Sequence, residues 1–226
     1  MTKSIRIAIL ICTLGFGALT VLVACGVAIP GDAELVQFAL STRSEPLTHA
    51  IWVLTFISSS VPAFFITLVV SGVELWRVRR IKFTAIWQTA VWPTAVWSTV
   101  AYLGNVVCNI ATRVAVGRLR PGVEYIPHRL PEVQASFQRF SYPSGHAGAA
   151  LLAYVALVVL AWPHAVLRWG ALTVALLVIV GTGFGRVYLG VHWPTDVLGG
   201  YLLAGCWLGI GMTLRRWNEI WLKRFV

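Results

Sequence analysis

Most of the polar residues that could do chemistry in this chain fall in three short strings, at 113–121 (RVAVGRLRP), 142–146 (YPSGH) and 185–196 (GRVYLGVHWPTD). Each string lies at the end of a strongly apolar segment. Arginine binds phosphate oxygens through a planar fork of N–H donors and keeps its charge at physiological pH. Histidine serves as a nucleophile or as a proton donor near neutral pH. Together the three strings therefore predict chemistry on an oxyanion.

An anion pocket is the first expectation. Arg113, Arg120 and Arg186 would form a strongly positive site if the strings converge. An arginine at the centre of a bilayer costs about 2.5–3.5 kcal/mol, so a place near a span end and an anionic ligand would both offset the cost. Ser144 and Gly145 precede an apolar run, and we expect a helix to start there. The free N–H groups of a helix start bind anions, and glycine lets the backbone approach closely.

The two histidines and the aspartate predict the reaction. Neutral imidazole attacks phosphorus when a carboxylate fixes the proton on its other nitrogen, and Asp196 is placed to do this for His192. His146, at the start of a different helix, could protonate the leaving oxygen. Either histidine alone would more often be structural. A His–Asp pair, a second histidine and an arginine cluster together predict phosphoryl transfer through a phosphohistidine.

A metal centre is the competing interpretation, since His192, Asp196 and His146 all have metal-compatible side chains. Three guanidinium groups nearby would repel a divalent cation, and the sequence contains no HExxH or cysteine cluster. The cysteines fall inside predicted spans without CxxC spacing, so we interpret them as small hydrophobic residues buried in the membrane, without a disulfide or metal role. They are Cys12, Cys25, Cys108 and Cys206. We expect neither a metal nor a cofactor.

The elements that must position these residues are membrane helices. The chain has 226 residues, of which 58% are hydrophobic and 12% charged, and its mean hydropathy is +0.78. These values are typical of polytopic membrane proteins. A span needs about 20 apolar residues. We therefore predict an all-α bundle of six transmembrane helices forming a single domain, 1–226, with spans at 5–30, 49–75, 84–112, 147–163, 168–187 and 195–214.

Three features interrupt this pattern. The connection 31–48 is polar and acidic and predicts a short interfacial helix. Three serines followed by Pro62 predict a kink in the second span. The only long polar insertion, 113–146, joins spans 3 and 4, and a loop of that length in a compact bundle is usually functional. Arg129 and Arg139 in this loop are candidates for recognising a head group.

The net charge of +10 would suggest nucleic acid in a soluble protein, but here its distribution fits a membrane orientation. If the N-terminus is cytoplasmic, eleven of the 18 basic residues lie on that side, as the positive-inside rule favours. Both termini are then cytoplasmic. All three strings lie at span ends on the opposite, extracytoplasmic side.

The N-terminus also allows a rival interpretation. Lys3 and Arg6 followed by an apolar run ending in LVAC, at 22–25, resemble a lipoprotein signal with its cysteine. Small residues before a cysteine are common in any apolar helix, and five further spans follow. We therefore favour an uncleaved first span.

The three strings resemble the signature of the type-2 phosphatidic acid phosphatase family of membrane lipid phosphate phosphatases. That signature reads Lys-x6-Arg-Pro, Pro-Ser-Gly-His and Ser-Arg-x5-His-x3-Asp. Here it reads Arg113-x6-Arg120-Pro121, then 143–146 (PSGH), then Gly185-Arg186-x5-His192-x3-Asp196. Order and spacing match, and the six-span layout extends the resemblance over essentially the whole chain.

The resemblance implies roles for individual residues. His192 would attack phosphorus, Asp196 would orient it, and His146 would protonate the leaving group and later activate water. The phosphoryl oxygens would be held by Arg113, Arg120, Arg186, Ser144 and Gly145. No metal or cofactor is implied.

Two positions depart from the signature. Arg113 stands where the family has lysine, which keeps the charge but changes the contact from a point to a fork. Gly185 stands where the family has serine. This removes one hydroxyl from the phosphate shell, and a lost hydrogen bond to a charged group costs about 1.5–3 kcal/mol unless a backbone N–H replaces it.

The resemblance implies a bacterial plasma-membrane phosphatase that acts on a lipid phosphomonoester or diphosphate, of the undecaprenyl diphosphate, phosphatidylglycerophosphate or phosphatidate type. Its partners would be the lipid substrate and membrane lipids, without nucleic acid. Two other functions stay open. A lipid-to-lipid phosphotransferase would use the same phosphohistidine with an alcohol acceptor, and an anion or lipid transporter would use the arginines only for binding.

Overall fold

A computed structural model describes residues 3–79, 91–121 and 139–225, and in these ranges all the regular structure beyond one isolated β-bridge is helical. The apolar composition produces eight helices in these ranges: α1 (Lys3–Ala24), α2 (Asp32–Ser41), α3 (Glu45–Ile57), α4 (Ser60–Arg79), α5 (Val91–Val116), α6 (Gly145–Ala161), α7 (Ala165–Tyr188) and α8 (Pro194–Phe225). The predicted all-α class and the short helix in the 31–48 connection, α2, are both present.

Length and hydropathy decide which helices could cross a membrane. Among the described residues, four segments are long and apolar enough: α1, α7, Trp97–Val116 of α5 and Pro194–Leu214 of α8. The pair α3 and α4 passes the test together, with a 46° bend at its break, and makes a possible fifth. The remaining apolar helix, α6, has 17 residues. It is therefore about 26 Å long, which is less than the ~30 Å thickness of the hydrocarbon core of a bilayer.

The predicted second span is broken, not merely kinked. The helix ends at Ile57 and a new one starts at Ser60. Ser58 turns its hydroxyl back onto the Leu54 and Thr55 carbonyls, at 3.0 and 3.2 Å, and Pro62 in the next turn has no N–H to continue the first helix. The start of the predicted third span, 84–90, lies outside the described residues, and α8 continues well past the predicted 214.

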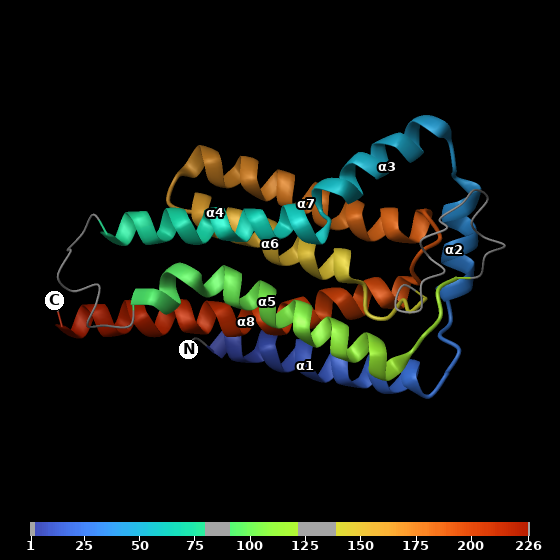
Figure 1. Ribbon diagram of the computed structural model, residues 1–226, viewed down its shortest axis with the longest axis horizontal. Helices are drawn as coiled ribbons and strands as arrows, with labels where there is room; N and C mark the ends of the chain where they lie inside the picture. Colours follow the sequence, from blue (N-terminus) through green and yellow to red (C-terminus); the bar gives the residue numbers. More distant parts are fainter. Residues whose placement is uncertain (1–2, 80–90, 122–138, 226) are drawn as a thin grey trace.

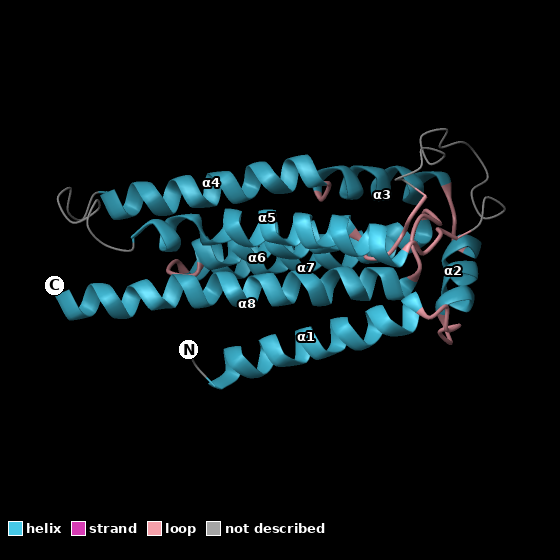
Figure 2. Cartoon of the chain, turned by 60° about the horizontal axis from the view of Figure 1, so that its bottom comes forward, coloured by secondary structure: helices cyan, strands magenta, loops and turns pink. Residues whose placement is uncertain are grey.

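The long helices run side by side, and α2 lies across one end of the bundle (Figures 1 and 2). The first residues of α1 and the last of α8 are at the opposite end (Figure 1). At the α2 end, α5 and α7 finish while α6 and α8 begin. The three polar strings are therefore at one end of the molecule, as the span count predicts.

Small residues let the central helix α6 pack closely against α8. Ala147, Ala149, Ala150 and Ala153 are buried. A Cβ at Gly200 would overlap the Ser144 carbonyl oxygen, so this backbone approach requires a glycine. Close packing of α6 on α8 holds the start of one helix, with His146, beside the start of the other, with Asp196.

Candidate active site

The first string turns back from the end of α5 to meet the second. Gly117 has φ +64°, a conformation that glycine adopts without strain, and it redirects the chain after α5. Leu119 then forms an isolated antiparallel bridge with Phe140, and the Ser141 N–H donates to the Arg118 carbonyl at 2.8 Å. This short ladder places the segment after α5 beside the residues that lead into α6.

Ser144 fixes the start of α6 against α8. It is the N-cap of α6, and its hydroxyl oxygen accepts the Ala147 N–H at 3.5 Å. Its own N–H donates to the Asp196 carbonyl oxygen at 2.8 Å. The predicted helix start is therefore present, and it is bonded directly to the third string.

The third string forms the tight connection between α7 and α8. Gly190 has φ +71°, and the His192 N–H donates to the Arg186 carbonyl at 3.3 Å. Pro194 starts α8, a position where proline needs no N–H partner. The turn folds His192 back toward Asp196 in the first turn of α8.

These elements enclose a cavity of about 250 Å³. Six of the eight predicted site residues line it: Arg113, Arg120, Arg186, Gly145, His146 and His192. The other lining residues come from α4, α5 and α6: Ser60, Tyr102, Asn105, Val106, Asn109, Ile110 and Ala149. Ser144 and Asp196 do not line it and are fully buried behind it.

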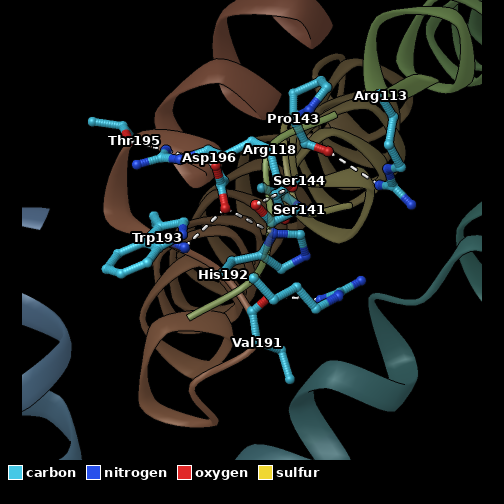
Figure 3. Close-up of polar contacts among 12 residues, drawn as sticks. Arg113, Arg118, Ser141, Pro143, Ser144, Val191, His192, Trp193, Thr195 and Asp196 are labelled. Atoms are coloured by element: carbon cyan, nitrogen blue, oxygen red, sulfur yellow. Dashed lines mark hydrogen bonds and ion pairs between the residues drawn. The ribbon is translucent and has the colours of Figure 1, made fainter. Parts of the chain in front are cut away.

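His192 and Asp196 form a buried pair (Figure 3). The His192 ring nitrogen Nδ1 lies 3.4 Å from Oδ2 of Asp196, without hydrogen-bond alignment to any described group. The same Oδ2 accepts the Trp193 N–H at 2.9 Å. His192 is 1% exposed and Asp196 0%. The carboxylate therefore lies behind the imidazole, on its Nδ1 side.

Two of the cavity arginines, Arg113 and Arg120, are held by backbone carbonyls, as expected for side chains fixed in advance of a ligand. Nη2 of Arg113 donates to Oδ1 of Asn109 and to the Pro143 carbonyl, both at 3.1 Å. Nη1 of Arg120 donates to the Val191 carbonyl at 2.5 Å. Nε of Arg186 is buried and has no hydrogen-bond partner in the described ranges.

The electrostatics of the cavity are dominated by positive charge. Burial, followed by repulsion from Arg113, lowers the pKa of Arg120 to about 10. Burial, and then the charges of Arg120 and Arg186, hold the pKa of the His192 imidazole well below its ordinary value. His192 is consequently neutral at physiological pH, the form that a nucleophile requires.

Three residues around Asp196 were missed by reasoning from the sequence. Arg118 donates from Nη1 to Oδ1 of Asp196 at 2.9 Å and to the Thr195 hydroxyl at 2.7 Å, and from Nη2 to Oδ2 of Asp32 at 2.6 Å. The only signal for Arg118 was its place within the first string. Asp32 gave none, because it lies far away in sequence.

Two asparagines of α5 were also missed, although the sequence contains a signal for them. Asn105 and Asn109 stand eight and four residues before Arg113 in an apolar segment, so they share its helix face. They are 2% and 5% exposed and line the cavity. A polar stripe on an otherwise apolar helix marks the wall of a polar cavity.

Position 185 does not face the cavity. A Cβ there would lie 2.9 Å from Cγ2 of Ile51 and 3.3 Å from Cγ2 of Thr55, both on α3. The residue is buried and is not among those lining the cavity. The side-chain direction at this position therefore points to α3, and glycine there allows α3 and α7 to pack.

The loop arginines, a possible metal site and the cysteines were the other candidates from the sequence. Arg139 is exposed and Arg129 lies outside the described residues. In the part of the chain that the structure describes, no three His, Cys, Asp or Glu side chains lie close enough to hold a metal ion. The four cysteines are free thiols.

Comparison with known proteins places these features in a family. The PAP2 superfamily model matches residues 94–220, which include all three strings. The chain is 31% identical over 109 residues to an undecaprenyl-diphosphatase of Sulfolobus acidocaldarius, covering 48% of each chain. It is 33% identical over 93 residues to phosphatidylglycerophosphatase B of Bacillus subtilis, covering 39% of this chain and 42% of the relative. The chain thus spans about half the length of the curated relatives it matches.

A solved structure has the same fold. It is described as the crystal structure of the first transmembrane PAP2 type phosphatidylglycerolphosphate phosphatase from Bacillus subtilis, and it superposes with a TM-score of 0.67. The two chains are 20% identical, and the match covers 92% of this chain and 96% of that one. The helical arrangement is therefore that of a multi-pass membrane bundle.

Proposed function

This chain belongs to the PAP2 superfamily, and from that premise we propose that it is an integral membrane lipid phosphatase that uses a phosphohistidine intermediate. The observation on which this depends most is the single cavity wall shared by both histidines and three arginines. Their charge and chemistry match a phosphoryl group and its transfer.

In the first step, the phosphoryl group enters among Arg113, Arg120 and Arg186, whose guanidinium groups neutralise its oxygens. Gly145 is the first residue of α6, and a Cβ there would point toward Arg113, 3.4 Å from its Nη2. Without a side chain, Gly145 leaves the helix N-terminus beside this arginine open to the anion. Ser144 contributes by capping that helix.

Nε2 of His192 then attacks phosphorus. A bond forms between Nε2 and phosphorus while the bond to the leaving oxygen breaks; this oxygen belongs to the lipid alcohol of a monoester or to the lipid monophosphate of a diphosphate. His146, protonated once the negative charge of the bound phosphate offsets the arginines around it, gives its proton to that oxygen. Asp196, on the Nδ1 side, stabilises the positive charge that develops on the ring. In the second step His146 takes a proton from water, and the resulting hydroxide displaces His192 to release phosphate.

The substrate is a lipid phosphomonoester or diphosphate. The relatives' names include an undecaprenyl-diphosphatase and a phosphatidylglycerophosphatase, and phosphatidate has the same phosphomonoester group. The cavity continues past the arginines between α4, α5 and α6, where Tyr102, Val106 and Ile110 line it. A mixed polar and apolar wall of this kind suits the junction of a head group and a lipid chain.

The membrane arrangement belongs to the same proposal. We infer six spans in a single domain, 1–226, with α3 and α4 together as the second span and α6 as the short fourth. The termini are cytoplasmic and the cavity extracytoplasmic in a bacterial plasma membrane. Because α6 is too short to cross fully, its start and the cavity lie slightly below the membrane surface.

Phosphate release by the purified protein tests this function. The substrates are undecaprenyl diphosphate, phosphatidylglycerophosphate and phosphatidate in detergent micelles, with His192→Ala as the control. We expect phosphate release from at least one substrate. In the variant the rate of release should fall by at least about 10³-fold, because the other catalytic residues cannot replace a missing nucleophile. Absence of release from every substrate would contradict the proposal.

The same experiment distinguishes the other two functions. A lipid-to-lipid phosphotransferase would form a new lipid phosphate without free phosphate when an alcohol acceptor is added. A transporter would move labelled substrate across vesicles equally well in the wild type and in His192→Ala.

A further inference from the structure

The buried charge behind Asp196 extends away from the cavity. The Arg118 guanidinium bonds to Asp196, Thr195 and Asp32 at 2.6–2.9 Å, and it stacks 5.3 Å from the centre of the Trp193 ring. Arg118 does not line the cavity, unlike Arg113. Its guanidinium group connects the carboxylates of Asp196 and Asp32. Arg118 is therefore not one of the arginines that would hold the phosphate.

Asp32 is the more unusual member of this group. It is the first residue of α2 and is 5% exposed. Its Oδ1 accepts the Thr195 N–H at 3.0 Å, and its Oδ2 accepts the Thr195 hydroxyl at 2.6 Å as well as Arg118. The carboxylate thus attaches α2 to the first turn of α8, one residue before Asp196.

The charge count explains why a second carboxylate is useful. Arg118 alone would neutralise Asp196, and a neutralised carboxylate would stabilise little positive charge on His192. With Asp32 present, one cation lies between two carboxylates and the group keeps a net negative charge. In a buried site of low dielectric that charge acts strongly on the imidazole nearby.

We propose that Asp32 and Arg118 are positioning residues: they hold the Asp196 carboxylate in place and preserve its negative charge for His192. This inference rests on the proposed role of His192 as nucleophile. It makes α2, which contributes no residue to the cavity wall, a part of the active site.

Asp32→Asn tests the proposal, with Glu34→Gln as the matched control. Both change a carboxylate to an amide on α2, but Glu34 is exposed and bonds the Gly31 N–H at 3.1 Å, which glutamine can still do. We expect kcat of Asp32→Asn to fall by about tenfold or more, because lost stabilisation in the transition state lowers kcat. KM and the inhibition constant of inorganic phosphate should stay within about threefold, since the arginine cavity is intact. Glu34→Gln should match the wild type.

A spectroscopic measurement separates positioning from general damage. In ¹⁵N-histidine-labelled protein the wild-type His192 ring should show one tautomer, with the proton on Nδ1 facing Asp196. Asp32→Asn should give a mixture, and Arg118→Gln a larger proportion of the other tautomer. Arg118→Lys should restore part of the wild-type signal.

Three outcomes would overturn the inference. One is an Asp32→Asn variant with the kcat of Glu34→Gln. Another is loss of kcat, phosphate affinity and thermal stability together, which indicates a structural role. The last is an unchanged His192 ring signal. If the wild type itself releases no phosphate, the proposed function fails, and the ring signal alone then decides whether Asp32 positions Asp196.

Discussion

At residue 185, a position of the family signature has a packing role in this chain. By analogy with the family, Gly185 would lack a phosphate-binding hydroxyl. Its Cβ direction, however, points at Ile51 and Thr55 of α3, and β-branched side chains cannot move aside cheaply. The glycine is therefore explained by helix packing and not by a lost contact to phosphate.

Gly185→Ser should accordingly destabilise the protein without raising its activity. Overpacking of this kind costs about 1–3 kcal/mol, visible as a lower midpoint of thermal unfolding in detergent. The control is Gly72→Ser on α4, where a Cβ meets nothing within 4 Å. An increase in kcat with unchanged stability would show that the serine hydroxyl reaches the phosphate after all.

At the scale of elements, the sequence predicted what local chemistry determines. Alternation of apolar runs and polar breaks located the helices, and Pro-Ser-Gly before an apolar run located the start of α6. The break between Ile57 and Ser60 was predicted only as a kink, because whether a helix resumes its direction depends on what it packs against. The bond between Asp32 and Arg118 was unpredictable, since nothing local relates residues so far apart.

The contact between α1 and the start of α6 is a second example of such long-range positioning. Tyr142 is fully buried, bonds the Thr20 hydroxyl at 2.9 Å and stacks on Phe16 with ring centres 6.2 Å apart. Its ring lies against Gly199 of α8, where any Cβ would overlap it. This ring therefore contacts both α1 and α8 and sets the path of the chain into Ser144.

Gly199→Ala should therefore displace Tyr142 and with it the start of α6. We expect a lower unfolding midpoint, corresponding to about 1–3 kcal/mol of overpacking, together with a raised KM, because the anion-binding helix start moves. The control is Gly17→Ala on α1, which meets nothing within 4 Å and should be neutral or slightly stabilising. A Gly199→Ala variant with wild-type KM would show that displacement of Tyr142 does not move the start of α6.

At the scale of the whole molecule, the charge distribution favours one orientation, and the fold is compatible with it. The basic residues favour cytoplasmic termini, and the first residues of α1 and the last of α8 lie at the end of the bundle opposite to α2 (Figure 1). If the orientation is right, the site receives lipid at the outer face. A lipid phosphate exposed there would be hydrolysed outside the cytoplasm, with phosphate released to that side.

Cys25 offers a direct test of this orientation, because it is exposed and follows the end of α1 on the α2 side. In bacterial spheroplasts a membrane-impermeant maleimide should label wild-type Cys25 and, in a Cys25→Ser background, an added Gln37→Cys on the exposed face of α2. In the same Cys25→Ser background, His164→Cys, at the exposed turn between α6 and α7, should be labelled only after lysis. Labelling of Cys25 also requires a free thiol, so it excludes the lipoprotein interpretation of the first segment. The reverse pattern, with His164→Cys labelled in intact spheroplasts and Gln37→Cys protected, would place the cavity in the cytoplasmic leaflet.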